Sequence, residues 1–338
     1  MRGRNPKVAV LGGGTWGTTV ASIAARKTPT VLWLRDPEIA KAINETHQNP
    51  RYLAGFDLAP SLRATADLVE AVEEADMLVA GVPSQYLRGV LERVAEHIRP
   101  FIPVVSLVKG LEQGSCKRMT EVIGEVLPGH PAGVLSGPNI AREVVQGLSA
   151  AATLAMPDHR GAQALQGLVH TSRYRVYTSE DVIGVEIAGA LKNVFAIAVG
   201  FGDGLGAGDN TRAMVITRSL HELTRLGVAL GGQAETFAGL AGMGDLIVTC
   251  VSPHSRNRRV GVELGRGRPL DEILASMNQV AEGVRSAAEV VKLAAGKGIE
   301  MPIAREVDAV LNHRQPVEET YRGLLSVTPG HEVYGEAW

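Results

Sequence analysis

Short apolar stretches alternate with helical stretches through the first half of the chain. The apolar stretches are bounded by turn-forming residues and lie at 7–11, 30–34, 75–83, 103–110, 132–138 and 149–155. The segments between them place apolar residues at helical spacing, as in QYLRGVLERVAEHI at 85–98. Regular alternation of strand and helix predicts a doubly wound, mostly parallel sheet of the Rossmann-like α/β class.

This alternation ends near residue 180. Beyond it the sequence contains long helical stretches, at 185–199, 209–228, 258–265, 285–298 and 303–313, and little that resembles a strand. A chain of 338 residues is also long for a single domain. We therefore predict an α/β domain over residues 1–180, followed by an all-α domain over residues 181–338.

Composition excludes several classes of protein. The formal net charge of −2 gives no general attraction to nucleic acid or to anionic membranes. The two cysteines, Cys116 and Cys250, form neither a disulfide framework nor a metal motif, and the histidines show no metal-ligand spacing, so we expect no metal. No apolar run reaches transmembrane length and the N-terminus offers only VAVL. We expect a cytoplasmic protein without stable membrane association.

A glycine-rich turn follows the first predicted strand. GGGTWG contains the G-x-G-x-x-G pattern as Gly12, Gly14 and Gly17, and it leads into a helical stretch that starts with Thr15 and Trp16. Such glycines allow a tight turn, close approach of a pyrophosphate and close helix–strand packing, with the phosphates at the helix N-terminus. Glycine-rich turns also occur without a ligand, but strand, turn and helix in this order predict a dinucleotide site.

The second predicted strand ends in an arginine. Arg35 lies 18 residues beyond Gly17, where an acidic residue would bind the ribose of NAD and an arginine can bind the 2′-phosphate of NADP. Asp36 follows directly, and a solvated charge pair is the alternative interpretation. The sequence favours a preference for NADPH without settling which of the two residues points inward.

Lys109 and Gly137 each end a later predicted strand. In open α/β sheets, ligands bind beyond the carboxyl ends of the strands. A lysine at such a position is often only solvated, but here it lies on the ligand side of the sheet. We therefore retain both residues as candidates for a binding site.

One lysine interrupts a helical stretch that otherwise consists of apolar and small residues. Between Ile187 and Val199 only Lys192 and Asn193 are polar. A buried ammonium group is costly, so such a lysine is either paired or has a lowered pKa. Alternatively, the side chain reaches the surface over the small residues Ala188 and Gly189. The stretch alone does not decide between these two interpretations.

A second polar cluster lies at 239–261. Asp245 is predicted in a glycine-flanked turn, before a short apolar run that ends at Thr249, and it is a candidate counter-charge for Lys192. Ser255 leads into a predicted helix start beside Arg256 and Asn257. A hydroxyl, an amide, a guanidinium and backbone N–H groups together suit an anion. A solvated basic helix start is the alternative.

Two other features have simpler explanations. The segment GFGDGLGAGDN at 200–210 resembles a phosphate loop but lacks the terminal Gly-Lys-Ser/Thr, so we predict a break between two helices there. His254 lies next to Ser255, and we expect no direct role for it.

Taken together, these motifs resemble the NAD(P)-dependent glycerol-3-phosphate dehydrogenases of bacteria. The resemblance covers nearly the whole chain, and its most specific parts are DVIGVEIAGALKNVFAIAVGFGDGLGAGDNT and SRNRRVG. It also includes VLGGGTWGTT, VPSQYLRGVL, VKGLE, LSGPNIAREV, TFAGLAGMGDLIVTC and VAEGVRSA. It implies interconversion of glycerol 3-phosphate and dihydroxyacetone phosphate, which supplies phospholipid synthesis, by a protein that we expect to be a homodimer.

The resemblance also implies a role for each matching residue. Lys192 resembles the catalytic base, and the reacting end of the substrate is lined by Asn193, Asp245 and Thr249. Lys109, Gly137 and Asn139 complete the substrate contacts. The group that binds the substrate phosphate in the family is matched here by Ser255, Arg256 and Asn257. The residues implied in binding NAD(P) are Gly12, Gly14, Thr15, Trp16, Gly17, Arg35, Lys109, Ala141, Arg256, Val280 and Glu282.

The chain departs from the family pattern at three places. Thr15 stands where serine is usual, and Leu107-Val108 precede Lys109 where a threonine is common. Asn139 occupies a position where serine or threonine is common, which puts its substrate contact in question.

Other functions remain compatible with the motifs. A two-domain dehydrogenase acting on 3-hydroxy acids would place a carboxylate at Arg256. A protein that senses NAD(P) would bind the cofactor without turnover. A nucleotide-dependent transferase is disfavoured because it leaves Lys192 and Asp245 unexplained.

Overall fold

The computed structural model of the chain describes residues 5–277 and 281–325, and it contains two compact units. The first consists of the chain up to Val108 and Lys117–Val182, and the second of Lys109–Cys116 and the chain from Ile183 onward. The predicted boundary between folding domains, at residue 180, stays a prediction. That residues 109–116 belong with the second unit was not predicted from the sequence.

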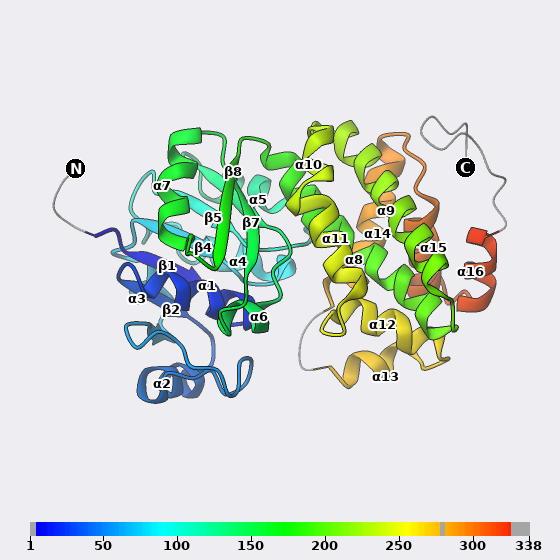
Figure 1. Ribbon diagram of the computed structural model, residues 1–338. Helices are drawn as coiled ribbons and strands as arrows, with labels where there is room; N and C mark the ends of the chain where they lie inside the picture. The colour runs from blue at the N-terminus through cyan, green and yellow to red at the C-terminus, as the bar shows by residue number, and fades with distance from the viewer. Residues whose placement is uncertain (1–4, 278–280, 326–338) are drawn as a thin grey trace. The chain divides into compact units, whose positions relative to one another are not determined.

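The first unit is built on an eight-stranded sheet with the order β3-β2-β1-β4-β5-β6-β7-β8 (Figure 1). Neighbouring strands are parallel except for the antiparallel pair β6 and β7. The predicted Rossmann-like, mostly parallel sheet is therefore confirmed. The strands are β1 (Val8–Leu11), β2 (Thr30–Trp33), β3 (Arg63–Thr65), β4 (Met77–Ala80), β5 (Val104–Ser106), β6 (Ala132–Ser136), β7 (Ala150–Ala155) and β8 (Tyr174–Ser179).

Two of these strands were missed in the sequence. Strand β3 has only three residues, RAT, which is too short to show any period. Strand β8 reads YRVYTS, and Tyr174 and Val176 are buried while Arg175 and Tyr177 are exposed. It lies at the edge of the sheet and one of its faces is exposed to solvent, so it lacks the continuous apolar run of the central strands.

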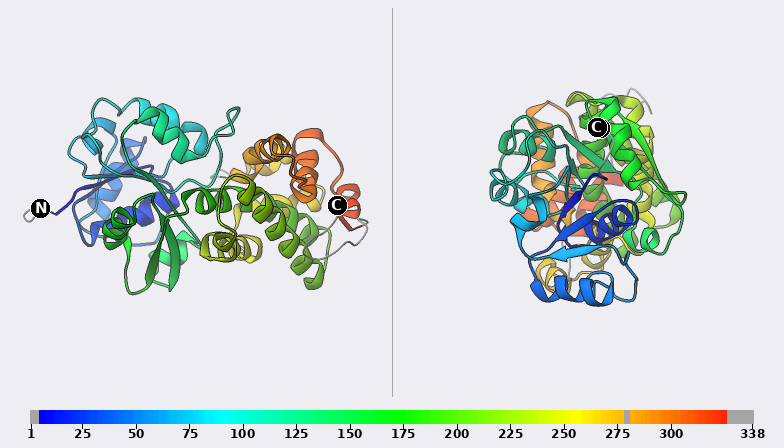
Figure 2. Two further views of the ribbon diagram at one scale, coloured as in Figure 1. Left: turned by 90° about the horizontal axis from the view of Figure 1, so that it is seen from above. Right: turned by 90° about the vertical axis from the view of Figure 1, so that its left-hand side faces the viewer.

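Helices cover both faces of the sheet (Figures 1 and 2). Side chains alternate across strand β1, so Val8 and Val10 enter one apolar core and Ala9 and Leu11 enter the other. The first core includes residues of α1 (Thr15–Ala25), α2 (Pro37–Thr46), α6 (Ala141–Val145) and α7 (His159–Val169). The second includes residues of α3 (Leu68–Val72), α4 (Ser84–Glu92) and α5 (Met119–Val126).

One predicted helix is shorter than expected. The helical spacing at 85–98 continues past the end of α4 at Glu92, and Val94 and Ile98 are buried. The backbone there forms turns, with Val94 N donating to Leu91 O and His97 N donating to Val94 O. The apolar period correctly marked burial, but it did not require an unbroken helix.

Apart from the irregular segment Lys109–Cys116, the described residues of the second unit form helices joined by turns. Its long first helix is α8 (Val182–Gly204), and the predicted break after residue 200 is the turn between α8 and α9 (Asp209–Ala229). The remaining elements are α10 (Ala234–Ala238), the π-helical turn η1 (Leu240–Gly244), α11 (Asp245–Val251), α12 (Arg256–Gly265), α13 (Leu270–Ala275), α14 (Glu282–Gly296), α15 (Pro302–His313) and α16 (Val317–Leu325).

Helix α8 is the central helix of this unit. Every residue from Gly184 to Gly202 is buried, Lys192 and Asn193 included. The helix is long and apolar enough to cross a membrane, but 89% of its most apolar window is buried inside the protein. Burial against neighbouring helices therefore accounts for its composition.

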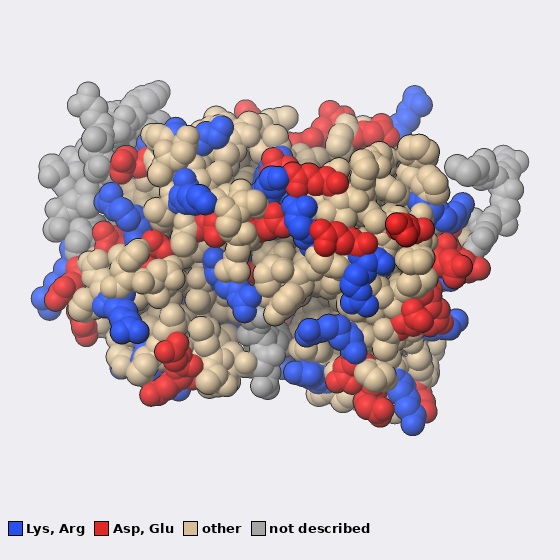
Figure 3. Space-filling model, turned by 180° about the vertical axis from the view of Figure 1, so that it is seen from behind, with Lys and Arg blue, Asp and Glu red and all other residues tan. Residues whose placement is uncertain are grey.

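Surface charges of the two signs are mixed. On the face seen in Figure 3, Lys and Arg side chains are interspersed with Asp and Glu side chains. This distribution agrees with the formal net charge of −2 for the whole sequence. The face in view carries no extended region of one sign that would attract a polyanion.

Glycines allow α8 and α12 to approach each other closely. A Cβ atom at Gly261 of α12 would lie 2.1 Å from the carbonyl oxygen of Ile197, and one at Gly200 of α8 would lie 2.3 Å from that of Arg258. Gly204 and Gly265 repeat this relation one turn further along. The close packing fixes the position of α12, which starts with Arg256 and Asn257, relative to the helix that contains Lys192.

We predict that Gly261→Ala lowers the free energy of unfolding. The added methyl group would meet backbone atoms, which cannot move aside as a flexible side chain can, so α12 must shift. Overpacking of this kind costs roughly 1–3 kcal/mol, measurable by denaturant unfolding. Gly89→Ala is the control, because a Cβ at this α4 position meets nothing within 4 Å. Equal stabilities of the Gly261→Ala variant and the native chain would contradict the packing argument.

Candidate active site

Two lysines share one buried aspartate in the second unit. Lys192 of α8 donates from Nζ to Asp245 Oδ1, and Lys109 donates from Nζ to Asp245 Oδ2 over 2.7 Å. The side chains of Lys192 and Asp245 are 6% and 1% exposed, and that of Lys109 is 17% exposed. The structure therefore excludes the interpretation that Lys192 reaches the surface. The predicted counter-charge at Asp245 is present.

Burial lowers the pKa of the Lys192 ammonium group to about 7, from an ordinary value of 10.5. The carboxylate of Asp245 acts in the opposite direction, and the nearby charge of Lys109 lowers the pKa further. The sequence left open which of these effects dominates, and in the structure desolvation does. Lys192 can therefore gain and lose a proton near neutral pH, which an ordinary lysine cannot do.

Asp245 is positioned by a helix start rather than by the turn predicted from its flanking glycines. It is the first residue of α11 and follows the π-helical turn at Leu240–Gly244. Thr249 lies one helical turn later, and its Oγ1 accepts a hydrogen bond of 2.7 Å from Lys192 Nζ. The carboxylate and the hydroxyl thus face the same ammonium group from one side of α11.

A chain of side-chain amides connects the site to three other segments. Asn193 Nδ2 donates to the carbonyl oxygen of Lys109 over 2.9 Å, and Asn257 Nδ2 donates to Asn193 Oδ1 over 2.8 Å. Asn257 Oδ1 in turn accepts from the backbone N–H of Gly283 over 3.0 Å. These bonds join the segment 109–116, α8, α12 and the start of α14. Both amides are therefore engaged within the protein.

The structure places Ser255 and Arg256 at the start of α12, as the sequence predicted. Ser255 is the N-cap, and its Oγ accepts from Arg258 N over 3.2 Å. The side chain of Arg256, the first helical residue, is exposed, and the backbone N–H groups of this turn point out of the helix. A hydroxyl, a guanidinium and a helix N-terminus are thus available together to one anion.

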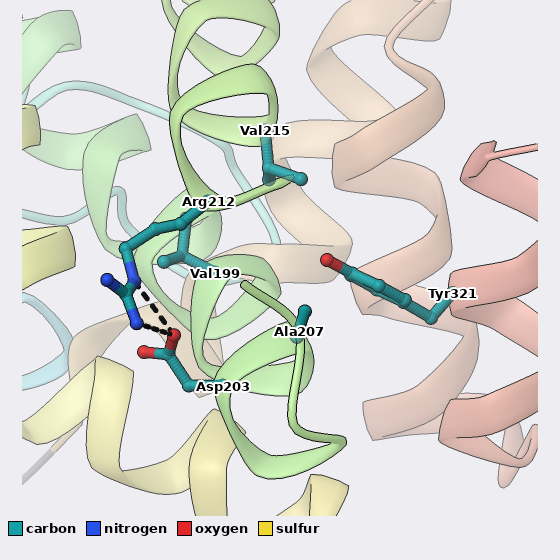
Figure 4. Close-up of a pocket in the computed structure, with 7 residues that line it drawn as sticks. Val199, Asp203, Ala207, Arg212, Val215 and Tyr321 are labelled. Atoms are coloured by element: carbon teal, nitrogen blue, oxygen red, sulfur yellow. Dashed lines mark hydrogen bonds and ion pairs between the residues drawn. The ribbon is translucent and has the colours of Figure 1, made fainter. Parts of the chain in front are cut away.

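Asp203 anchors the first turn of α12 to the end of α8. It pairs with Arg258 of α12 and with Arg212 of α9, both over 2.7 Å, and its side chain is 7% exposed. Figure 4 shows Arg212 directed toward Asp203. These ion pairs hold Arg258, two residues beyond Arg256, in a fixed place. The sequence did not single out Asp203, although its position in the 200–210 segment was noted.

In the first unit, the glycine-rich turn has the geometry that a dinucleotide requires. Gly12 has a φ of +117°, and a Cβ there would lie 2.7 Å from the carbonyl group of Gly81. A Cβ at Gly17 would lie 2.0 Å from Gly12 O, so this glycine is needed for close packing. At Gly14, the N-cap of α1, a Cβ would meet no described atom within 4 Å, and no side chain caps the helix. The open position and the uncapped N–H groups fit a bound pyrophosphate.

Several polar atoms near this turn and after β6 are buried without a partner. Thr15 Oγ1, Trp16 Nε1 and both amide atoms of Asn139 have no hydrogen bond within the described part of the chain. Buried polar atoms in folded proteins are nearly always paired, so these atoms suit a bound ligand. Ala141 is the first residue of α6, directly after this loop.

Gly137 has a structural reason to be glycine. Its φ is +144°, and a Cβ there would lie 2.9 Å from Ala152 Cα on strand β7. The residue therefore allows β6 and β7 to approach each other, whatever it contributes to ligand binding.

Arg35 and Asp36 have different surroundings in the structure. Asp36 is the N-cap of α2, and its Oδ1 accepts from the backbone N–H groups of Glu38 and Ile39. The Arg35 guanidinium is exposed and lies over the ring of Tyr86, 5.8 Å from the centroid. Tyr86 was not predicted as a site residue. It follows strand β4 in the first turn of α4, so the strand order was needed to bring it near Arg35.

Three further residues were considered in the sequence, namely Val280, Glu282 and His254. Val280 lies outside the described residues, and Glu282 is the first residue of α14. His254 is exposed on the turn before α12. Across residues 5–277 and 281–325, no group of three or more His, Cys, Asp or Glu side chains could hold a metal ion.

Comparison with known proteins identifies the family. Residues 7–162 match the N-terminal model of NAD-dependent glycerol-3-phosphate dehydrogenase, and residues 181–322 match the C-terminal model. The chain is 62% identical to the glycerol-3-phosphate dehydrogenase [NAD(P)+] of Mycobacterium avium strain 104, over 99% of this chain and 98% of that protein. It is 50% identical to that of Thermobifida fusca strain YX, over 97% of this chain and 99% of the relative.

A solved structure agrees with these sequence matches. The crystal structure of the glycerol-3-phosphate dehydrogenase from Coxiella burnetii superposes with a TM-score of 0.92 and 36% identity, over 96% of this chain and 99% of that one. Sequence and fold thus match along nearly the full length. The chain belongs to the family of NAD-dependent glycerol-3-phosphate dehydrogenases.

Proposed function

We propose that Lys192 is the general base in the reaction of this family, the interconversion of sn-glycerol 3-phosphate and dihydroxyacetone phosphate with NAD(P). The observation that carries the proposal is the buried Lys192 ammonium group, which shares Asp245 with Lys109 and has a pKa of about 7. A base works best when its pKa lies near the pH of the reaction. The reaction also suits the supply of glycerol 3-phosphate to phospholipid synthesis.

Oxidation of the secondary alcohol requires removal of a proton from the hydroxyl group and of a hydride from C2. Bound NAD(P) supplies the hydride acceptor or donor. The neutral amine of Lys192 takes the hydroxyl proton and becomes an ammonium, which Asp245 and Thr249 can stabilise through the bonds they already make. In the reverse direction the ammonium returns the proton to the carbonyl oxygen.

The phosphate of the substrate is held at the start of α12 in this proposal. Arg256 provides a forked pair of donors, Ser255 a hydroxyl, and the helix N-terminus its backbone N–H groups. Asn257 and Asn193 keep one free N–H donor each, since the other bonds of their amides run to protein atoms. We therefore assign these asparagines mainly to holding the site together. Binding energy from the phosphate orients the reacting carbon.

The contacts of the cofactor with individual residues also belong to this proposal. The glycine-rich turn with Thr15 and Trp16 would hold the pyrophosphate, supported by the open N-terminus of α1. Asn139 with its unpaired amide would contact a ligand after β6. The roles of Gly137, Ala141, Val280 and Glu282 rest on the resemblance alone. So do a homodimeric assembly and a cytoplasmic location.

We also propose a preference for NADPH over NADH. The carboxylate of Asp36, which would repel a 2′-phosphate, is partly compensated by two backbone N–H groups at the start of α2 and by Arg51 at 4.0 Å. The exposed guanidinium of Arg35 is held over Tyr86, where a phosphate could accept from it.

A dehydrogenase of the same architecture acting on 3-hydroxy acids is the nearest alternative. It would use a carboxylate in place of the phosphate at Arg256. Following NADPH absorbance with dihydroxyacetone phosphate and with unphosphorylated 3-oxo acids distinguishes the two. Turnover of the oxo acids alone would reject the proposal, and binding of NADPH without any turnover would indicate a sensor.

The first prediction of this proposed function concerns Lys192 as the base. Oxidation needs the neutral amine, so kcat/KM for glycerol 3-phosphate should rise as the pH passes through about 7. Reduction needs the ammonium, so its rate should fall over the same range. Lys192→Met should abolish both pH dependences, that is, the rising limb of the oxidation profile and the falling limb of the reduction profile. It should also reduce kcat by at least roughly 10²-fold, the low end for general acid–base catalysis.

The matched control for this variant is Lys297→Met, which removes an exposed lysine after α14. It should leave kcat and both limbs unchanged. A kcat within a few-fold of the native value for Lys192→Met would show that the lysine is structural.

The second prediction concerns the phosphate. Arg256→Lys should raise KM for dihydroxyacetone phosphate strongly, because a lysine cannot reproduce the forked donor geometry. Arg259→Lys, an exposed position on the same helix, should behave like the native enzyme. Native-like steady-state kinetics of Arg256→Lys would reject the assignment.

The third prediction concerns cofactor choice. Arg35→Ala should raise KM for NADPH much more than for NADH, since only NADPH carries the phosphate. Arg26→Ala, which removes an exposed arginine at the end of α1, should change neither value. An equal rise for both cofactors would mean that Arg35 does not contact the 2′ position.

A further inference from the structure

The segment Lys109–Cys116 is fastened at both ends to helices of the second unit. At its first end, Lys109 bonds Asp245 of α11 through Nζ and accepts from Asn193 of α8 at its carbonyl oxygen. At its other end, the carboxylate of Glu289 on α14 accepts from Gly114 N over 3.0 Å and from Cys116 Sγ over 2.8 Å.

The bonds to α14 hold a tight turn. Gly114 and Cys116 both have positive φ, of +82° and +58°, and the value for Cys116 lies in a region that residues other than glycine rarely adopt. Lys292, one turn after Glu289 on the same helix face, donates to Gly114 O over 2.9 Å. Burial and the Glu289 carboxylate raise the pKa of the Cys116 thiol to about 11, so it stays protonated and can donate.

This fastening bears on the site because Lys109 is part of the segment. The position of Lys109 determines whether Asp245 is shared between two ammonium groups or belongs to Lys192 alone. The described titratable groups that act on Lys192 or respond to it are Asp245 of α11, Lys109 of the segment and Cys250 of α11. Of these, Lys109 is the one whose backbone lies outside the packed helices.

We propose that Glu289 is a positioning residue for the reaction. By holding the turn at Gly114–Cys116, it keeps Lys109 on Asp245 and so keeps Lys192 able to act as a neutral base. The inference rests on the proposed function of Lys192. Glu289 bonds to Gly114 and Cys116 rather than to Lys192 or Asp245, so its effect must pass through the segment.

The test is the pH dependence of glycerol 3-phosphate oxidation in Glu289→Ala. With the turn released, Lys109 withdraws from Asp245. Because the charge of Lys109 lowers the pKa of Lys192, its withdrawal raises that pKa and moves the rising limb of the kcat/KM profile to higher pH. We expect a shift on the order of one pH unit, the scale of a neighbouring charge. A structural role alone would lower the melting temperature and leave the limb in place.

Three further variants make the test specific. Cys116→Ser keeps a donor for Glu289 and should behave like the native enzyme. Glu289→Gln keeps one acceptor oxygen and should give a smaller shift in the same direction. This variant replaces Glu289→Ala in the test if Glu289→Ala does not fold. Glu272→Ala removes an exposed carboxylate from α13 and should leave the limb unmoved.

A double-mutant cycle identifies the route. In a Lys109→Met background, adding Glu289→Ala should produce no additional shift, because the group through which it acts is gone. An equal shift in that background, an unmoved limb in Glu289→Ala and Glu289→Gln, or a shift in Glu272→Ala would each overturn the inference. If the native enzyme has no limb that Lys192→Met removes, the proposed function itself fails, and the two failures are thereby distinguished.

Discussion

The site depends on one buried carboxylate that serves two ammonium groups. Asp245 is almost completely buried and bonds Lys192 through one oxygen and Lys109 through the other. With two cations on one anion, neither lysine receives full compensation, and the more deeply buried one bears the larger desolvation cost. Desolvation is the largest cause of the low pKa of Lys192, and the second ammonium group on Asp245 lowers that pKa further. Burial and the sharing of Asp245 together give a lysine that can exchange a proton near neutral pH.

The helices around the triad are held by contacts that tolerate little displacement. Glycines at the α8–α12 contact bring backbone atoms together, so the phosphate-binding candidates on α12 have a fixed relation to Lys192. The amides of Asn193 and Asn257 connect the same two helices to Lys109 and Gly283. Polar residues that look like substrate ligands in the sequence thus contribute first to the rigidity of the site. Such rigidity is what precise placement of a reacting carbon requires.

The sequence predicted the features that local patterns determine. Strand–helix alternation predicted the parallel sheet, the glycine pattern predicted an open helix N-terminus at Gly14, and Ser255 was predicted as the start of α12. Long-range features were out of reach. Which of Arg35 and Asp36 faces outward depends on the cap of α2 and on Tyr86 from another strand end. The π-helical turn before Asp245 and the fastening of Cys116 to Glu289 have no local signature, because they arise from packing between segments far apart in the chain.

The central claim is that desolvation outweighs the counter-charge at Lys192, and a direct titration tests it. Lysine labelled with ¹³C at Cε allows each ammonium group to be followed by NMR, with Lys192 assigned from the signal missing in Lys192→Met. The account predicts a midpoint of about 7 for this signal. It also predicts that the midpoint rises in Lys109→Met, since the second cation on Asp245 is then absent. A midpoint near the ordinary lysine value of 10.5 would contradict the account.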